Sequence, residues 1–490
     1  MKYSIAIAFA LLGPTFAAAQ GPDLRQLDEL VQQSLKAWDV PGAALVVVHN
    51  DQVLWLKGYG RRAIDKPDPV TSDTIFPLAS CSKTFTSAAI ALLVSQGKLS
   101  WDDPVRKQLP EFRLHDKHAS ELVSIRDLLS HRTGVGGHDF LWYRAPWSQD
   151  ESIRRLAHLP LNGPFRGSFF YQSIMYMALG RIVDGFHDEK WPGFIRDQLL
   201  KPLGMSHTFL TYAEGQKQKD VAAGHRLQSN GKVEICPWYQ QDEPNAAGSI
   251  CLSAADLGKW LKFQLSGRGT SKRIVPLDIL NETHQPHVVI PHVGFSKLLN
   301  PDTVQLSYGQ GWVVQDYRGI HLVQHGGLID GFRVHLTLLP AHNAAIGILS
   351  NLHDRRMPLA LSNTLIDFLL RLAPRDWDAY YGELVRQDDK AKEEFEKKRE
   401  QQRNPKVAAS LALDRYAGEY EHAAYGICKI KLKEGKLQWE WSSFRHALEH
   451  YRGDTFQVRD MYLSDPLIEF TVRDHKVEKL KMLEMEFVRK

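Results

Sequence analysis

The sequence predicts an α/β fold in which an antiparallel sheet is flanked by helices and carries an inserted helical subdomain, followed by a small antiparallel β domain. Strand patterns lie at both ends of the first 375 residues, at 42–59 and 310–350, and helical patterns dominate between them. Strands around a helical middle indicate one sheet covered by helices. At 490 residues the chain is also too long for one hydrophobic core, which favours at least two domains.

Each element of the first domain has a local signal. Residues 23–38 repeat apolar side chains at helical spacing, which predicts an amphipathic helix. Residues 42–49 and 53–59 predict two strands joined at Asn50-Asp51, a hairpin signal. A helix is expected over 80–96, followed by loops and further helices to Leu203, then by strands and a last apolar helix; the last strands and helix are at 310–317, 333–339, 344–350 and 358–372.

The C-terminal part changes in character twice. Dense charge follows Ala373, which predicts a solvated linker helix over 376–407 rather than a binding surface. Short alternating segments such as 427–432, 437–441 and 468–472 then indicate a β domain over 408–490. The large domain is therefore expected over 20–375.

Residues 1–19 have the layout of a signal peptide. Lys2 precedes the apolar run 5–12, and Ala17-Ala18-Ala19 offers a small-residue cleavage site. The apolar run is shorter than a membrane-spanning helix needs, so we expect cleavage, no stable membrane anchor and a secreted or periplasmic protein.

Composition excludes several function classes. The net charge of +4 is small and spread along the chain, so no nucleic-acid partner is expected. Four cysteines cannot form a disulfide framework, although Cys236 and Cys251 lie close enough in sequence for one bridge to remain open. Neither Cys-x-x-Cys nor His-Glu-x-x-His occurs, so neither a metal nor another cofactor is expected.

The motif Ser-x-x-Lys occurs three times, and context selects the first copy. Ser95–Lys98 and Ser229–Lys232 place Gly beside the Lys, as surface turns do. Ser80 and Lys83 instead open an apolar helix, where residues three apart share a face. A buried lysine of lowered pKa can activate a serine hydroxyl, and a helix N-terminus can stabilise an oxyanion. The alternative is that Ser80 only caps the helix and Lys83 lies on the surface.

Three separated segments together resemble the penicillin-recognising serine hydrolases, the family of β-lactamases, penicillin-binding proteins and related esterases and D-aminopeptidases. The first is Phe76-x-x-x-Ser80-x-x-Lys83-x-Phe85-Thr86, which is similar to the family's nucleophile motif. The second, Tyr171-Gln172-Ser173, resembles a Tyr-x-Asn element, and the third, His325-Gly326-Gly327, resembles a His-x-Gly variant of the Lys-Thr-Gly strand. Further segments follow in the family's order, at 99–105, 128–134, 202–205 and 247–257.

The resemblance implies a β-lactamase/transpeptidase-like fold and a serine acyl-enzyme mechanism. Ser80 would attack a carbonyl, while Lys83 and Tyr171 shuttle its proton, with the tyrosine phenolate as the favoured base. The oxyanion hole would be the backbone N–H groups of Ser80 and Leu328, the latter following a His-Gly-Gly turn on the edge strand. Gly326 and Gly327 would leave room for substrate. His325 would orient Tyr171 or meet a substrate carboxylate, unless it is only structural.

One residue departs from the family pattern. Ser173 stands where asparagine is usual, and a hydroxyl offers fewer hydrogen bonds than an amide, so substrate contacts there are in doubt. The expected function is cleavage of amide or ester bonds in small molecules or short peptides, especially peptides with D-residues. A carboxylesterase, a β-lactamase and a slowly deacylating penicillin-binding protein remain alternatives.

Specificity and the C-terminal domain are less defined by sequence. Loops at 136–147 and 286–303 are expected to set substrate choice. The C-terminal domain, with Tyr416-Ala417-Gly418-Glu419-Tyr420, resembles the lipocalin-like β domain appended to some of these hydrolases. Such a domain would shield the active-site mouth or mediate assembly, and the oligomeric state stays open.

Overall fold

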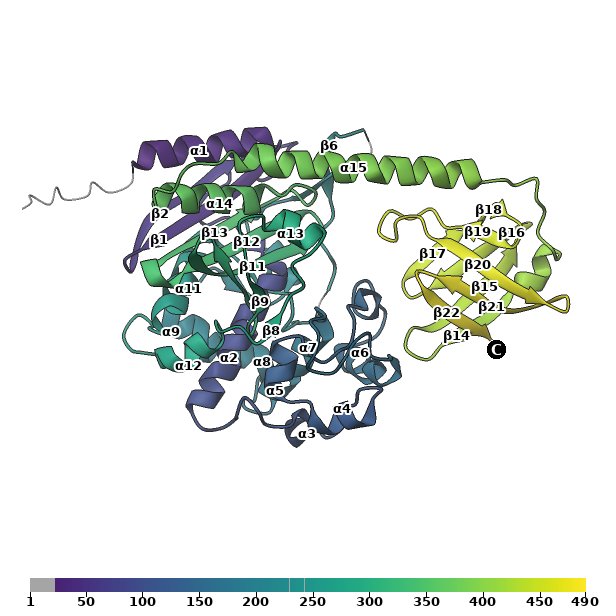
Figure 1. Cartoon of the computed structure of the whole chain (residues 1–490), viewed down its shortest axis with the longest axis horizontal. Coiled ribbons are helices and arrows are strands. Elements are labelled where there is room, and N and C mark those ends of the chain that lie inside the picture. The colour runs from purple at the N-terminus through teal and green to yellow at the C-terminus, as the bar shows by residue number, and fades with distance from the viewer. Residues whose placement is uncertain (1–22, 229, 242) are drawn as a thin grey trace, which may run out of the picture.

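The computed structural model describes residues 23–228, 230–241 and 243–490 and confirms the predicted fold class (Figure 1). A large α/β domain precedes a long helix, and a small antiparallel β domain ends the chain. The expected signal peptide lies outside the described residues. Among the helices described, none is long and apolar enough to cross a membrane.

The large domain is built on an eight-stranded antiparallel sheet with the order β2-β1-β13-β12-β11-β10-β9-β8. The hairpin predicted at Asn50-Asp51 is present, since both residues have the positive φ that a tight two-residue turn uses. The strands are β1 (Gly42–His49), β2 (Gln52–Gly60), β8 (Val288–Val289), β9 (Leu306–Tyr308), β10 (Val313–Tyr317), β11 (Ile320–Ile329), β12 (Phe332–Leu339) and β13 (Ala344–Ser350).

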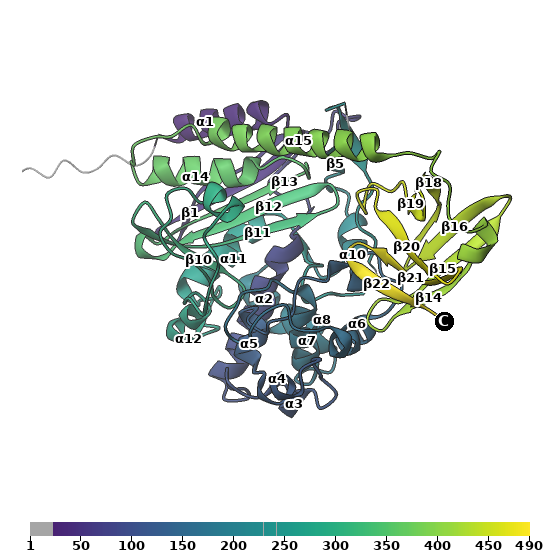
Figure 2. The same cartoon turned by 45° about the vertical axis from the view of Figure 1, so that its right-hand side comes forward.

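Helices cover both faces of this sheet, and β1 shows why. Its side chains alternate between two cores: Leu45 and Val47 face one side, and Val46 and Val48 face the other, all buried. Each such side chain contributes about 1.5–3 kcal/mol by leaving water. The first face packs on α1 (Leu24–Ala37), α14 (Met357–Leu369) and the start of α15 (Trp377–Gln402), and the second on α2 (Lys83–Ser95) and α11 (Ala254–Ser266) (Figure 2).

A mainly helical subdomain is inserted between β2 and β9, a span that also contains the edge strand β8, and it lies beside α2 (Figure 1). Its α7 packs along α2 and so brings residue 173 next to residue 83. The elements are α3 (Val105–Gln108), α4 (Lys117–Leu122), α5 (Ile125–Leu129), α6 (Gln149–Arg155), α7 (Ser173–Asp184), α8 (Lys190–Ile195), α9 (Lys201–Leu203), α10 (Tyr212–Gln216), α12 (Leu277–Glu282) and α13 (Phe295–Leu299), with short strands β3 (Phe76–Pro77), β4 (Thr208–Phe209), β5 (Gly224–Leu227), β6 (Val233–Cys236) and β7 (Cys251–Leu252).

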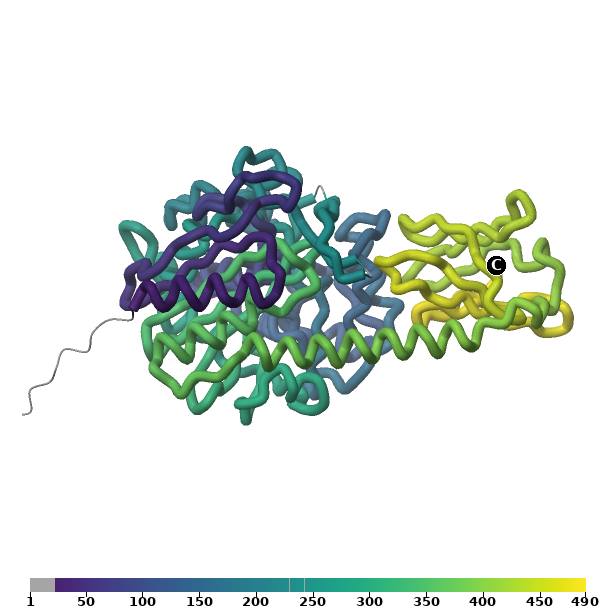
Figure 3. Tube along the Cα trace, turned by 90° about the horizontal axis from the view of Figure 1, so that it is seen from above, coloured from purple at the N-terminus to yellow at the C-terminus, as the bar shows by residue number. Residues whose placement is uncertain are grey.

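Helix α15 joins the two domains. Its 26 residues span about 39 Å, and the helix runs from the large domain to the C-terminal domain (Figure 3). Trp377, Tyr381 and Leu384 are buried, whereas most of the charged remainder is exposed. The nine strands that follow are β14 (Gly418–His422), β15 (Gly426–Lys433), β16 (Lys436–Trp441), β17 (Phe444–Ala447), β18 (Glu449–Arg452), β19 (Thr455–Gln457), β20 (Leu467–Arg473), β21 (Lys476–Met482) and β22 (Met485–Arg489).

The C-terminal sheet is barrel-like. Its order, β17-β16-β15-β14-β22-β21-β20-β19-β18, places β17 and β18 at opposite ends. Only Leu448 separates these two strands in sequence, so the sheet must curl until its ends nearly meet.

The cysteines do not form the bridge that the sequence left open. Cys81, Cys236, Cys251 and Cys428 are all free and buried. The packing of the described chain therefore depends on its two hydrophobic cores and not on disulfides.

Candidate active site

Ser80 lies in a tight 3₁₀ turn, Ala79–Ser82, immediately before α2, rather than in the α-helix that the sequence predicted. Ala79 has a φ of +48°, an unusual value for a residue with a side chain. The turn is held on two sides, because Leu78 N–H donates to the Ile250 carbonyl at 2.7 Å and Cys81 Sγ donates to the His325 carbonyl at 3.2 Å.

Lys83 is the first residue of α2 and is fully buried. Its Nζ lies 3.3 Å from Ser80 Oγ, 3.4 Å from Ser173 Oγ and 2.9 Å from the carbonyl oxygen of Ala247. Burial lowers the pKa of the ammonium to about 7, against a smaller opposing effect of Asp139. A large fraction of Lys83 is therefore uncharged near neutral pH and able to accept the Ser80 proton.

Tyr171 lies beside this pair. Lys83 Nζ is 4.9 Å from the centre of its ring, and its hydroxyl is shielded from water without a hydrogen-bond partner among the described residues. Burial raises the pKa of the phenol strongly, and nearby Ser80, just beyond hydrogen-bond geometry, offsets only part of this. A raised pKa favours the neutral phenol over the expected phenolate, and which of Lys83 and Tyr171 serves as the base stays a prediction.

In the second motif segment, Tyr171-Gln172-Ser173, both Gln172 and Ser173 make hydrogen bonds that hold the segment in place. Gln172 Oε1 accepts from Ile174 N–H at 3.0 Å and caps α7, while its Nε2 donates to the Gly136 carbonyl at 2.5 Å. Ser173 begins α7 and directs its hydroxyl at Lys83. The short side chain thus retains the lysine contact expected of the position.

The third motif segment, His325-Gly326-Gly327, lies inside strand β11 and not on a turn of an edge strand. Strand β11 is flanked by β10 and β12, but β10 begins at Val313, opposite Gln324, so residues 325–329 have no partner strand on that side. A two-residue turn pairs Ile329 with Phe332. Backbone N–H groups alternate in direction along a strand, so the preceding residue, Leu328, directs its N–H away from β12 to this open edge. The side chain of Leu328 is 44% exposed. Its backbone N–H faces the open edge, where β11 contacts the Ala79–Ser82 turn, and its role as an oxyanion donor stays a prediction.

The two glycines of this strand have different roles. A Cβ on Gly327 would come within 2.5 Å of the Leu78 carbonyl oxygen and of Val334 Cγ2. Gly327 therefore makes room for the turn that carries Ser80, and not for substrate as expected. Gly326 is exposed, and the nearest atom to a Cβ there would be 3.7 Å away. Space for substrate remains at Gly326 only.

His325 is buried and contacts neither the Tyr171 hydroxyl nor the open cleft. Its Nε2 is 3.0 Å from Tyr308 Oη and its Nδ1 is 2.7 Å from the Gly326 carbonyl oxygen. Burial, assisted by Lys83, lowers its pKa to about 3, so the ring is neutral. Both ring nitrogens are therefore engaged, and His325 neither hydrogen-bonds to Tyr171 nor faces the cleft where it could bind a substrate carboxylate.

Sequence reasoning missed several neighbours of the catalytic pair. His131 is buried with its ring 4.4 Å from that of Tyr171 and 4.8 Å from that of Tyr308, and its Nδ1 accepts from Gln172 N–H at 3.3 Å. Its burial holds its pKa well below the usual range, so it adds no charge beside Lys83. The segment 128–134 had signalled this residue as part of the family pattern but not its position.

The cleft at Ser80 is narrow, with a volume of about 20 Å³, close to the space of one water molecule. No Lys, Arg or His side chain lines it within the described chain, and no group of metal-ligating side chains is found there. Its lining residues are Ala79, Ser80, Trp142, Ser173, Met177, Tyr212, Gln241, Asn245, Ala247, Gly248, Leu328 and Ile329.

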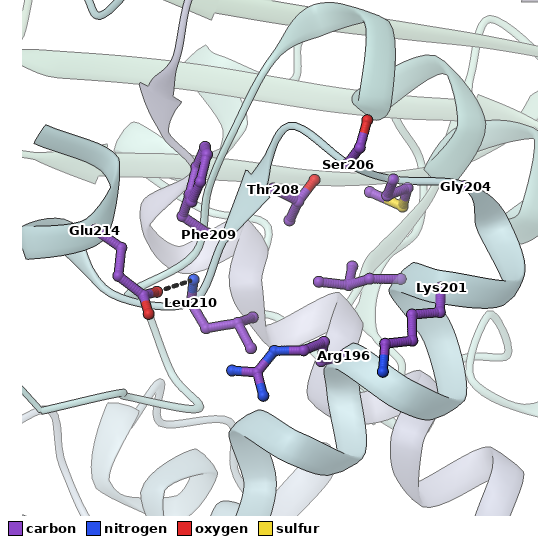
Figure 4. A pocket seen from close by; sticks show the side chains of 10 residues that line it. Arg196, Lys201, Gly204, Ser206, Thr208, Phe209, Leu210 and Glu214 are labelled. Atoms are coloured by element: carbon purple, nitrogen blue, oxygen red, sulfur yellow. Dashed lines mark hydrogen bonds between the residues drawn. The ribbon is translucent and has the colours of Figure 1, made fainter. Parts of the chain in front are cut away.

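A larger hollow lies elsewhere and shares no residue with this cleft. It measures about 450 Å³ and is lined by Arg196, Lys201, Phe209 and Glu214 among others (Figure 4). Glu214 accepts from Leu210 N–H at 3.1 Å and so serves the local backbone. The chemistry is therefore assigned to the smaller cleft.

Comparison with known proteins agrees with this geometry. The family model described as Beta-lactamase matches residues 27–370, and the model described as Domain of unknown function (DUF3471) matches residues 402–490. Unguisins hydrolase ungD from Aspergillus violaceofuscus is 28% identical over 87% of this chain and 81% of its own. Protein flp from Staphylococcus aureus is 28% identical over 68% of this chain and 64% of its own.

Solved structures share the fold. The octameric penicillin-binding protein homologue from Pyrococcus abyssi superposes with a TM-score of 0.64 at 21% identity, covering 95% of this chain and all of that chain. The D-amino acid amidase from Ochrobactrum anthropi superposes with a TM-score of 0.56 at 22% identity, covering 71% and 98%. With the family model spanning most of its length, the chain belongs to the Beta-lactamase family of serine hydrolases.

Proposed function

We propose that this protein is an exported hydrolase that cleaves amide or ester bonds of small substrates through an acyl-enzyme on Ser80. The observation that carries the proposal is the buried Lys83 amine 3.3 Å from Ser80 Oγ, with its pKa lowered to about 7. A neutral amine at hydrogen-bond distance from a serine hydroxyl is the arrangement that general-base activation requires.

Acylation follows from the positions of these groups. Ser80 Oγ attacks the substrate carbonyl carbon while its proton passes to Lys83 Nζ. The negative charge formed on the carbonyl oxygen meets the N–H groups of Ser80 and Leu328 at the open edge of β11. The tetrahedral intermediate then expels its amine or alcohol, which takes a proton from Lys83 or through the Tyr171 hydroxyl. The product is an ester on Ser80.

Deacylation uses the same groups in the reverse order. Water attacks the ester carbonyl and gives its proton to the Lys83–Tyr171 pair, and Ser80 Oγ is reprotonated as the acid leaves. The unpartnered Tyr171 hydroxyl can accept one bond and donate another, so it suits this relay.

The cleft favours uncharged substrate groups over carboxylates. No cationic side chain lines it in the described chain, and the neutral His325 is buried behind it. A substrate carboxylate, such as that of a penicillin, would find no counter-charge there. Amides of D-configured amino acids are the class we favour, in line with the printed titles of the D-amino acid amidase and D-stereospecific amidohydrolase neighbours.

The export part of the proposal comes from the sequence of residues 1–19 alone. N-terminal sequencing of the protein secreted by an expressing cell tests it. We expect a mature chain that begins at Gln20, and an unprocessed Met1 in the cytoplasm would contradict it.

Turnover of matched substrates tests the hydrolase. p-Nitrophenyl acetate, the p-nitroanilides of D- and L-phenylalanine, and nitrocefin are compared on wild type and Ser80→Ala. We expect hydrolysis of the ester, of the D-anilide more than the L-anilide, and little of nitrocefin, all lost in Ser80→Ala. Comparable turnover by Ser80→Ala contradicts the proposal, whereas ester hydrolysis alone identifies the carboxylesterase alternative.

A further inference from the structure

The C-terminal domain contacts the large domain through the loop 138–147, which also lines the cleft, and through Arg155, whose Nη1 donates to the Ala424 carbonyl at 2.7 Å. His138 Nδ1 is 2.7 Å from Tyr425 Oη, and Phe140 packs edge-on against Trp441. The same loop supplies Trp142, which forms part of the cleft wall. The domain interface and the substrate site therefore share one segment.

Arg144 in this loop contacts both the C-terminal domain and the end of β11 in the large domain. Its carbonyl oxygen accepts from Ser442 Oγ at 3.2 Å and Ser443 Oγ at 2.5 Å, and its guanidinium lies 3.7 Å from the centre of the Tyr462 ring. All three partners belong to the C-terminal domain. A guanidinium over an aromatic face at this distance is attracted by the ring's negative surface.

On its other side, Arg144 reaches the end of β11. Its Nη2 lies 2.7 Å from Asp330 Oδ2, and the neighbouring Tyr143 donates to Asp330 Oδ1 at 2.6 Å. The Asp330 side chain is only 8% exposed, so hydrogen bonds from these two donors, rather than water, stabilise its carboxylate. Asp330 begins the two-residue turn that ends β11, two residues after Leu328.

The backbone of Arg144 is itself held in an unfavourable conformation. Its φ is +53°, in the left-handed region that residues with side chains avoid. Such a conformation persists only when surrounding contacts fix it, and here Tyr239 accepts from Arg144 N–H at 3.3 Å while the two serines bind the carbonyl. The chain is thus bent to bring one side chain between Tyr462 and Asp330.

We infer that Arg144 is a positioning residue through which the docked C-terminal domain fixes the oxyanion end of β11 and the Trp142 wall. The inference rests on the proposed Ser80 hydrolase and adds a role for its C-terminal domain. The edge at 325–329 has no partner strand on the β10 side, and its turn is held by His225 N–H, which donates to the Gly331 carbonyl at 3.1 Å, and by His353 Nδ1, 3.2 Å from the Ile329 carbonyl oxygen. The Asp330–Arg144–Tyr462 chain adds the contact that joins this turn to the C-terminal domain.

The test measures the rate of Ser80 acylation in the full-length protein with p-nitrophenyl acetate and, independently, with a fluorophosphonate probe. Arg144→Gln and Asp330→Asn should each lower the acylation rate about tenfold, and the double variant should be no slower, because both remove one ion pair. Tyr462→Leu should lower it about threefold, whereas Tyr462→Phe, which keeps the ring, should match wild type. KM should change less than kcat.

Arg386→Gln is the matched control, because Arg386 is exposed on α15 and pairs only locally with Glu383. Thermal unfolding of each variant separates positioning from loss of fold. Wild-type acylation by folded Arg144→Gln and Tyr462→Leu would overturn the inference while leaving the hydrolase intact. Failure of the proposed hydrolase would give a different result, because wild type and Ser80→Ala would then show the same absence of a Ser80 adduct.

Discussion

The chemistry of single residues here depends on burial more than on charge pairs. Lys83 has a carbonyl and two hydroxyls around its Nζ, and among the described residues no carboxylate contacts it, so burial dominates and its pKa falls. The amine therefore loses its proton near neutral pH while remaining close to Ser80.

The pH dependence of kcat/KM tests this directly. Activity should rise with pH through about 7, because deprotonation of Lys83 creates the base, and level off above it. Stopped assays of ester turnover from pH 5 to 9 give the profile. A rise centred near 10 would mean that the lysine keeps its ordinary pKa and would contradict the assignment. Lys83→Ala should lose about 10²- to 10⁴-fold in kcat.

Tyr171 offers a test in which stability and activity move in opposite directions. Tyr171→Phe removes a buried hydroxyl that has no hydrogen-bond partner among the described residues, so the free energy of unfolding should rise by about 1 kcal/mol. Catalysis should fall about 100-fold, because the proton relay is lost. Chemical denaturation and steady-state kinetics give both numbers.

Tyr381→Phe is the matched control for that variant. The Tyr381 hydroxyl donates to the Leu299 carbonyl at 2.8 Å and accepts from Asn363, far from Ser80. Its removal should destabilise the protein and leave kcat unchanged. A Tyr171→Phe protein that is both less stable and fully active would refute the role of the hydroxyl.

At this scale the sequence predicts local chemistry but not its surroundings. Ser80 and Lys83 are one helical turn apart, so their meeting follows from spacing alone. The Ala247 carbonyl that holds Lys83 is 164 residues away, and its backbone atoms carry no sequence signal. The raised pKa of the Tyr171 phenol was hidden from the sequence for the same reason, since burial is a tertiary property.

At the scale of elements, the site depends on close contact between the Ala79–Ser82 turn and β11. The turn is held from both sides, by Ile250 and by the His325 carbonyl, and only a glycine at 327 allows the approach. The position of Ser80 against β11 is thus fixed by the packing of the turn against the strand.

Gly327→Ala measures that contact. The added methyl would meet the Leu78 carbonyl oxygen and Val334 Cγ2 at 2.5 Å, so the turn must move, and kcat should fall at least tenfold. Gly382→Ala in α15 is the control, because its nearest neighbour is the flexible Arg386 side chain at 3.6 Å and alanine suits a helix. Equal activity of the two variants would show that the close packing is dispensable.

Apolar periodicity predicted the longer elements of the large domain, namely α1, β1, β2, α2, β12, β13 and α14, but it did not give β11, which carries residues 325–328. It could not predict that β10 begins only at Val313, and that short strand is what leaves the edge of β11 open. The 3₁₀ turn at Ser80 was likewise hidden, since it is imposed by Ala79 and the neighbouring strands.

At the scale of the whole molecule, two domains are joined by α15 and by contacts at the 138–147 loop. The charged composition predicted a linker helix, and the resemblance of the C-terminal domain implied that it shields the active-site mouth or mediates assembly, but neither identified the loop that this domain contacts. Those contacts join residues such as Arg144 and Ser443, which are about 300 positions apart. Such pairing follows from the docked surfaces and not from any local pattern.

The free cysteines give a prediction for the intact protein. All four thiols are buried, so a thiol reagent should label none in the native state and four after denaturation, with or without prior reduction. Reducing agents should change neither the melting temperature nor activity. A protein that shows fewer than four thiols without reduction would contain a bridge and contradict the packing described.

The central claim is a covalent intermediate on Ser80, and intact-mass spectrometry tests it most directly. The purified protein is sampled milliseconds to minutes after addition of p-nitrophenyl acetate, with Ser80→Ala as the control. We expect a transient acetyl adduct on wild type, mapped to Ser80 by peptide analysis, with continuing release of p-nitrophenol. Steady turnover with no adduct at any time, or an adduct of equal amount on Ser80→Ala, would contradict the account.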